Sequence, residues 1–135
     1  MPPDTPARQS GIHGALAQLD RALDSPRRDG VALGNWRWTV RQRMTAVRDV
    51  LAHEQVGPQG TGGDGWLAAR GGAAFREREG LLLRLGAAGT QVLEAPDAEA
   101  VRVELKRLLA DVAHHLQRVH DLAYDEVELE LGGSE

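Results

Sequence analysis

Apolar residues recur at intervals of three and four along most of this chain, which is the spacing of one face of an α-helix. The longest stripe lies between residues 97 and 124 and comprises Val101, Leu105, Leu108, Leu109, Val112, Leu116, Val119 and Ala123. At about 100° per residue these positions form a face broad enough to pack against two neighbours. Proline at position 96 ends the preceding element, and Asp97 can cap the new helix. We therefore expect this helix to form the centre of the core.

Three earlier segments show the same periodicity, separated by proline- and glycine-rich breaks. Helices are expected over 10–24, from 31–35 to about 55, and over 66–93. The second of these carries the most regular stripe, formed by Trp36, Val40, Met44, Val47 and Leu51. Breaks at 26–30 and 57–65 are rich in turn-forming residues. The pattern predicts an all-α fold: a four-helix, mostly antiparallel bundle.

The two ends of the chain have a different character. Residues 1–9 are polar and rich in proline, so we expect them to be disordered, with one bundle domain over 10–131. The last helix is expected to end near Tyr124. Residues 127–131 alternate apolar and acidic residues, which suits an extended peptide, although Val127 also continues the helical stripe. The glycines at 132–133 stop any helix and leave a flexible end over 132–135.

Two arginines fall on apolar faces. Arg43 lies within the stripe of the second helix, and Arg78 lies on the apolar side of the third. Burying a guanidinium is costly unless a carboxylate meets it. We therefore expect both arginines to be partly buried and paired, with Asp20, Glu77 or Glu104 as acids for Arg43.

Composition narrows the classes of protein that this chain can represent. Its 135 residues are enough for one domain with a real core. The absence of cysteine excludes disulfides and thiolate metal sites. The net charge of −4 argues against nucleic acid as a partner, and no apolar run has the length of a membrane span. The first residues do not form a signal peptide, so we expect a cytoplasmic protein. A preference for arginine over lysine is typical of GC-rich bacterial genomes.

Histidines offer the sharpest chemical hypothesis, because bundles build metal sites from facing helices. On the last helix His114 points away from the stripe, whereas His115 and His120 flank it as boundary residues. With His13 on the first helix, the His53-Glu54 pair ending the second, and His120 followed five positions later by Asp125, the chain resembles the hemerythrin-like four-helix bundles. That resemblance implies a di-iron centre for oxygen or redox chemistry. The chain departs from the family on the third helix, which lacks histidine, and at Gly57, where a glutamate is expected.

The residues themselves thus predict no metal or other cofactor. The alternative, taken from the resemblance, is iron held by a set drawn from His13, His53, His115, His120 and Asp125. No catalytic constellation is visible either, since the serines lie in termini or loops and no carboxylates are paired in a predictable pocket.

An interaction surface is the remaining functional hypothesis. Trp38 lies near a row of arginines on the outer side of the second helix, formed by Arg37, Arg41 and Arg48. Tryptophan and arginine are favoured anchors in protein interfaces. The tail adds Val127, Leu129 and Leu131 between acidic residues. We therefore expect a non-catalytic interaction or structural module that forms a homodimer or binds a protein partner.

Overall fold

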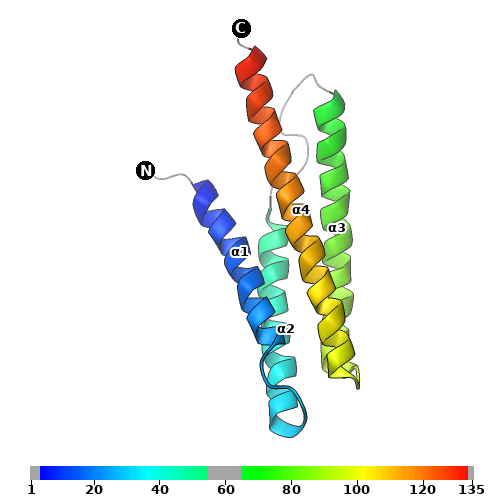
Figure 1. The fold of residues 1–135 in the computed structure, drawn as a ribbon. Coiled ribbons are helices and arrows are strands. Elements are labelled where there is room, and N and C mark those ends of the chain that lie inside the picture. Colours follow the sequence, from blue (N-terminus) through cyan, green and yellow to red (C-terminus); the bar gives the residue numbers. More distant parts are fainter. Residues whose placement is uncertain (1–3, 55–64, 134–135) are drawn as a thin grey trace.

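The computed structural model describes residues 4–54 and 65–133, which form four helices and no strand (Figure 1). The helices are α1 (Asp4–Leu23), α2 (Gly30–Ala52), α3 (Gly65–Glu94) and α4 (Ala98–Gly133). The predicted all-α four-helix fold is confirmed. Because each helix has one apolar stripe, side-by-side packing of the four is the arrangement that removes these stripes from water.

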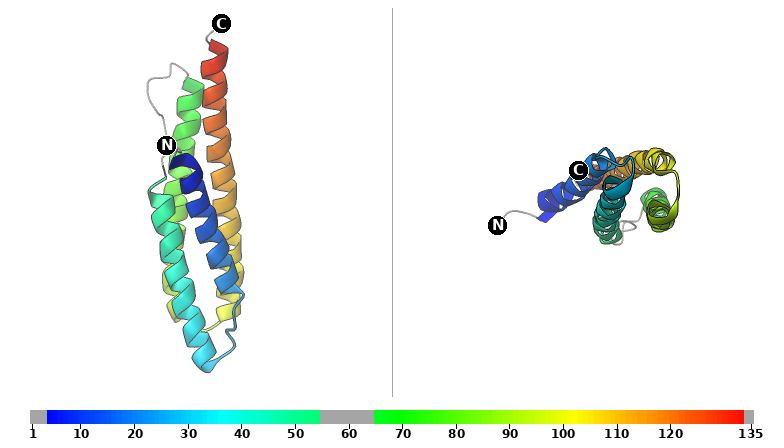
Figure 2. Two further views of the ribbon diagram at one scale, coloured as in Figure 1. Left: turned by 90° about the vertical axis from the view of Figure 1, so that its left-hand side faces the viewer. Right: turned by 90° about the horizontal axis from the view of Figure 1, so that it is seen from below.

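Ion pairs between the helices define how they run relative to one another. Arg84 on α3 pairs with Asp111 on α4 at 2.8 Å, and Glu77 pairs with Arg118 further along, so α3 and α4 run in opposite directions. α1 packs mainly on α2, and α2 also packs on α3. The contact between α1 and α4 is slight. The N-terminal end of α1 leans away from α4 (Figure 2).

The core follows the predicted stripes closely. All five residues expected to line the inner face of α2 are buried. On α4 the lower half of the stripe is buried, from Val101 to Val112, and Leu116 and Val119 are half-buried. Trp36 is the largest side chain in the core, and its indole Nε1 donates a hydrogen bond to the carbonyl oxygen of Leu23 at 3.1 Å. This bond joins the start of α2 to the end of α1.

Two helix ends are held by side chains in ways that local chemistry explains. The backbone N–H of Ala100 donates to the Asp97 carboxylate at 3.1 Å, which confirms the predicted cap of α4. At the end of α3, Arg37 donates from Nη1 to the carbonyl oxygen of Val92 at 2.7 Å and from Nη2 to that of Ala95 at 2.8 Å. These carbonyls lack partners within the helix and carry partial negative charge, which an arginine satisfies.

Both ends of the chain are more helical than expected. α1 begins at Asp4, within the segment that was expected to be disordered, and α4 continues past Tyr124 to Gly133. Pro6 falls in the first turn of α1, where its missing N–H costs no helical hydrogen bond. On α4 the helical continuation of the stripe prevails over the two-residue alternation. The predicted helix boundary near Tyr124 is therefore wrong.

The two arginines behave differently. Arg43 is exposed and donates to the side-chain oxygen of Gln18 at 3.1 Å, so the prediction that it is buried beside a carboxylate is wrong. Its long stem carries the guanidinium out to the edge of the α1–α2 contact. Arg78 is half-buried, with its Nε 3.5 Å from the Glu79 carboxylate and its guanidinium over the Phe75 ring. The expectation for Arg78 is confirmed.

Replacing Trp36 with phenylalanine tests the bond between α1 and α2. The change leaves the Leu23 carbonyl without its indole donor and opens a small cavity, so we expect the free energy of unfolding to fall by about 1–3 kcal/mol. Chemical denaturation measures this change. The matched control is Trp38→Phe, at a side chain that is 65% exposed, where the change should stay within about 0.5 kcal/mol. An equal loss of unfolding free energy in the two variants would contradict a special role for Trp36 between α1 and α2.

Candidate functional site

A histidine with no exposed surface lies between two carboxylates near the middle of α4. The His115 side chain is fully buried, its Nδ1 lies 2.6 Å from Oε1 of Glu77, and its Nε2 lies 2.9 Å from Oε1 of Glu54. Glu77 comes from α3, and Glu54 lies two residues beyond the end of α2. The histidine on α4 therefore joins three of the four helical segments at one point.

The geometry favours the protonated form of this histidine. A neutral imidazole carries one N–H, so its second nitrogen would turn a lone pair toward a carboxylate oxygen. Both nitrogens donate only when the ring is protonated. Burial acts to lower the pKa of His115, but the hydrogen bonds to Glu54 and Glu77 and their negative charges together outweigh burial and raise the pKa above its ordinary value of 6.5.

Arg118 completes the charge balance. It donates from Nε to Oε1 of Glu77 at 3.1 Å and also pairs with the other oxygen of that carboxylate. Partial burial acts to raise the pKa of Glu77, but the hydrogen bonds and charges of Arg118 and His115 lower it below the ordinary value of 4.5. Two carboxylates and two cations thus neutralise one another. Arg78 adds a hydrogen bond to the backbone carbonyl of Glu54.

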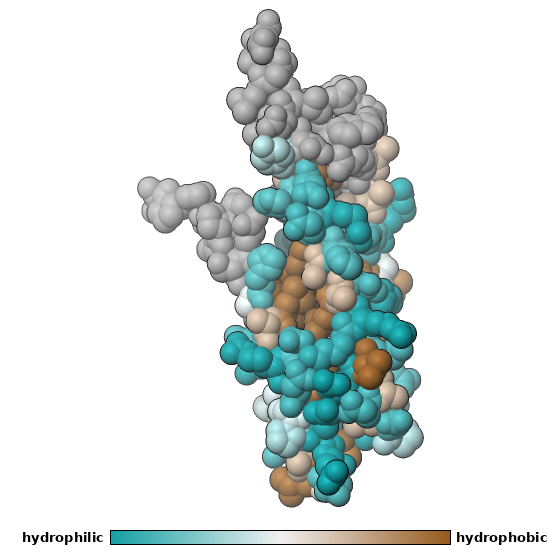
Figure 3. Space-filling view, viewed as in Figure 1, coloured by the Kyte–Doolittle hydropathy of each residue, from teal (hydrophilic) through white to brown (hydrophobic). Residues whose placement is uncertain are grey.

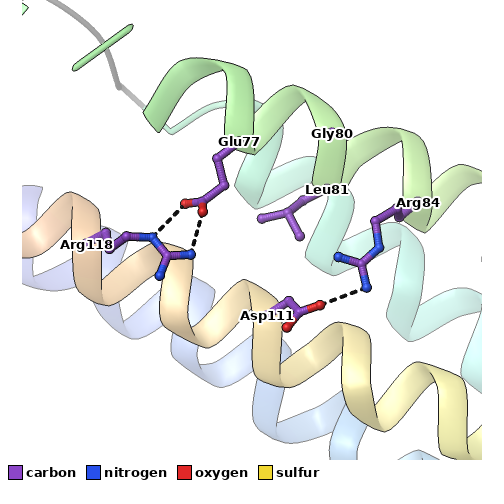
Figure 4. A pocket seen from close by; sticks show the side chains of 6 residues that line it. All are labelled: Glu77, Gly80, Leu81, Arg84, Asp111 and Arg118. Carbon is purple, nitrogen blue, oxygen red and sulfur yellow. Dashed lines mark hydrogen bonds and ion pairs between the residues drawn. The ribbon is translucent and has the colours of Figure 1, made fainter. Parts of the chain in front are cut away.

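A shallow pocket of about 350 Å³ opens beside this cluster between α3 and α4 (Figure 4). Its lining residues are Glu77, Gly80, Leu81, Arg84, Asp111 and Arg118. As Figure 4 shows, the charged residues form two ion pairs that bridge the helices, Glu77 with Arg118 and Arg84 with Asp111. Since each charge already has a partner of opposite sign, the pocket presents no free charge to a ligand.

The residues of the iron alternative do not gather around His115. His13, His53 and His120 are exposed on three different segments, and the side chain of Asp125 lies outside those that the structure describes. The Nδ1 of His53 lies 2.6 Å from the carbonyl oxygen of Asp49, on its own helix. Over the described residues, no group of three or more His, Asp or Glu side chains is arranged to hold a metal ion. At His115 both ring nitrogens already face carboxylate oxygens.

The residues of the expected interaction surface have different surroundings. Trp38 and Arg48 are exposed on α2, but the guanidinium of Arg37 is hydrogen-bonded to backbone carbonyls at the end of α3. The guanidinium of Arg41 lies so close to Gly89 on α3 that a β-carbon at that glycine would collide with it. The row of arginines therefore divides between contacts with α3 and solvent. Val127, Leu129 and Leu131 lie on the helical backbone of α4, and their side chains are outside the described set.

The sequence interpretation missed this cluster. His115 was expected at the boundary of the stripe, yet it is as buried as the core residues. Glu77 was considered as an acid for Arg43, and Glu54 was named only beside His53. One signal was present: His115 follows Val112 by three positions, which places both on the same side of α4. The acidic partners are 61 and 38 residues away in the chain, so helical periodicity could not reveal them.

No protein-family model matches this chain, and neither does any curated protein or any solved structure. The resemblance to hemerythrin-like proteins therefore stays a prediction. Over the described residues, none of the helices combines the length and the hydropathy needed to span a bilayer.

Replacing His115 with leucine tests whether the cluster contributes to stability. The substitution keeps an apolar side chain in the core but leaves Glu54 and Glu77 facing it without their shared cation. We expect the free energy of unfolding near neutral pH to fall by about 2 kcal/mol, less than for a fully buried pair because both carboxylates are partly exposed. Calorimetry or denaturant titration measures it. The neighbouring exposed histidine supplies the control, His114→Leu, for which a change within about 0.5 kcal/mol is expected. A stabilised H115L variant would show that the charges are dispensable.

Proposed function

We propose that this protein is a non-catalytic helical module that self-associates, with two copies pairing through the ends of α3 and α4. The observation that carries the proposal is the unequal length of the helices. α3 and α4 have 30 and 36 residues, whereas α1 and α2 have 20 and 23. In Figure 1 the upper ends of α3 and α4 extend beyond the other two helices. We call this two-helix part the extension.

The apolar stripe of α4 continues into the extension. α2 ends at Ala52, and Glu54 just beyond it is already level with His115. Leu116 and Val119 follow Val112 at helical spacing, so they lie on the same side of α4 as the buried part of its stripe. Both are only half-buried, as is Leu122, and Tyr124 is 60% exposed. In Figure 3 hydrophobic surface is also visible between α1 and α4 just below this level.

The composition of the remaining chain favours a partner from outside it. A cover for this face must supply large apolar side chains. Residues 4–11 contain none, and residues 55–64 contain only Val56. Residues 55–64 directly precede α3 in the chain, and residues 4–11 belong to the upper end of α1 in Figure 1. In a two-helix hairpin each helix has only one neighbour, so part of each apolar stripe stays exposed to water.

A second copy of this chain has the chemistry that such a face requires. Leu116 and Leu122 flank Val119 at three residues on either side, so antiparallel pairing about Val119 places each leucine opposite the other leucine of the second copy. Such self-complementarity is what a two-fold interface needs. Two extensions paired in this way form a further four-helix bundle, with an apolar core of the same kind.

Charge complementarity supports the same pairing. The end of α4 carries Asp125, Glu126, Glu128 and Glu130 in its sequence. Antiparallel pairing brings this acidic end of one copy alongside the region of Val112 in the other. An exposed cation lies near that level on a neighbouring helix, Arg48 on α2. Opposite charges at the rim favour this register over a parallel one, in which the two acidic ends would meet.

Two valines on α4 provide a matched test. We expect the wild-type protein to sediment as a dimer at micromolar concentration and Val119→Glu to sediment as a monomer, because the new carboxylate would be buried at the centre of the interface. The control is Val103→Glu, on the same helix at a side chain that is 46% exposed, which should leave the dimer intact. Circular dichroism checks that all three remain helical. A wild-type protein that stays monomeric throughout the concentration range would refute the proposed function.

A further inference from the structure

We propose that Glu54, His115 and Glu77 form a pH-dependent latch whose open state frees the end of α2 from α4 while α3 stays bound to α4. The latch has three parts: the histidine on α4, one carboxylate after α2 and one carboxylate on α3. Its closed state is the protonated ring that donates to both carboxylates. Loss of one proton leaves the ring with a single donor, so one of the two hydrogen bonds must be lost.

The surroundings decide which bond is lost. The contact from Nδ1 to Glu77 is the shorter, at 2.6 Å against 2.9 Å for Nε2 to Glu54. Glu77 is also oriented by two contacts from Arg118, which hold its carboxylate beside the ring. Within the described part of the chain, the Glu54 side chain has no hydrogen bond other than the one to His115. The remaining proton therefore stays on Nδ1, and the Glu54 carboxylate is released.

Release moves Glu54 toward solvent. If Glu54 stayed in place after the ring lost its proton, its carboxylate would face the lone pair of Nε2, and an unpaired carboxylate is costly to keep in partly buried surroundings. Its side chain is already 16% exposed and lies two residues beyond the end of α2, so a change of rotamer takes it into water. Arg78 still donates to the backbone carbonyl of Glu54, so the end of α2 keeps its contact with α3.

Other charged groups near the latch are already paired. On α3, Glu79 pairs with Arg78, and Arg84 pairs with Asp111 of α4. At the end of α2, the ring of His53 turns back toward the Asp49 carbonyl. Among the described residues, α1 contributes no group that bonds to the three residues of the latch. Their titration is therefore governed by one another, by Arg118 and by burial.

The direction of the pH dependence follows from the shifts at His115 and Glu77. The stability that His115 contributes is fully present below pH 6.5, its ordinary pKa, and is lost as the pH rises through its raised pKa in the folded protein. The contribution of Glu77 is present above 4.5 and is lost as the pH falls through its lowered pKa. The latch is thus closed at pH values between the lowered pKa of Glu77 and the raised pKa of His115. It opens on the alkaline side by release of Glu54.

The latch does not depend on the proposed self-association, because all of its groups lie within one chain. It lies where the four-helix part of the molecule gives way to the extension. Opening it would therefore loosen the end of α2 that borders the proposed interface. Readouts on the histidine ring and on the amides of α2 report on the latch whether the protein is a monomer or a dimer.

Nitrogen NMR of the histidine rings tests the tautomer directly in the wild-type chain. Below pH 6.5 we expect both ring nitrogens of His115 to be protonated, and above its raised pKa only Nδ1. The four exposed histidines in the same spectra supply reference curves. A neutral His115 that carries its proton on Nε2 would overturn the proposal, and this measurement needs no substitution.

Amide hydrogen exchange tests the release, with Glu54→Gln as the variant that keeps the latch closed. The glutamine amide can donate to unprotonated Nε2, so this bond survives deprotonation of the ring. At alkaline pH, amides over 49–54 should exchange roughly tenfold faster in the wild type than in E54Q, since one hydrogen bond to a charged group is worth about that factor. Glu104→Gln removes one charge at a distant exposed site and should behave like the wild type. Equal exchange in the wild type and E54Q, or a slowing in E104Q that matches E54Q, would refute the latch.

Discussion

Burial of one long apolar stripe on α4 against the other helices is the interaction on which this structure depends. The lower half of that stripe, from Val101 to Val112, is enclosed by neighbours and contributes most of what α4 adds to the core. Each fully buried aliphatic side chain stabilises the fold by roughly 1.5–3 kcal/mol, which no exposed ion pair approaches. Contacts such as Arg102 with Asp24 at the α1–α4 edge therefore select the orientation of helices that the apolar core has already brought together.

Along α4 the environment changes from apolar to ionic to partly exposed. His115 lies at the transition, where α2 ends and the stripe loses one of its neighbours. A histidine at this position is tolerated because the carboxylates of Glu54 and Glu77 satisfy both ring nitrogens and Arg118 balances the remaining charge. Removing water from such a group is unfavourable unless every donor and acceptor is paired. The ionic contact thus marks the place where the purely hydrophobic part of the bundle stops.

The functional hypotheses follow from this division of α4. Below His115 the four helices cover one another, and the charged residues at the pocket between α3 and α4 are paired among themselves. Above it, α3 and α4 continue beyond the end of α2, and residues 4–11 and 55–64 contain only one large aliphatic or aromatic residue, Val56, that could cover the half-buried part of the stripe. Self-association is the simplest way for a helical chain to complete such a surface, because a second copy already carries the matching stripe.

The sequence by itself determined the number of helices, the buried stripe of α2 and the cap at Asp97, because helical periodicity and capping are set by residues within a few positions of one another. Helix ends were predicted less well, since at Asp4 and beyond Tyr124 two local patterns competed. Only the tertiary structure decided that Arg43 reaches solvent, that Arg37 binds the end of α3 and that His115 is buried between Glu54 and Glu77. A helical wheel gives the direction of a side chain, whereas its partners depend on which helices become neighbours and where each one stops.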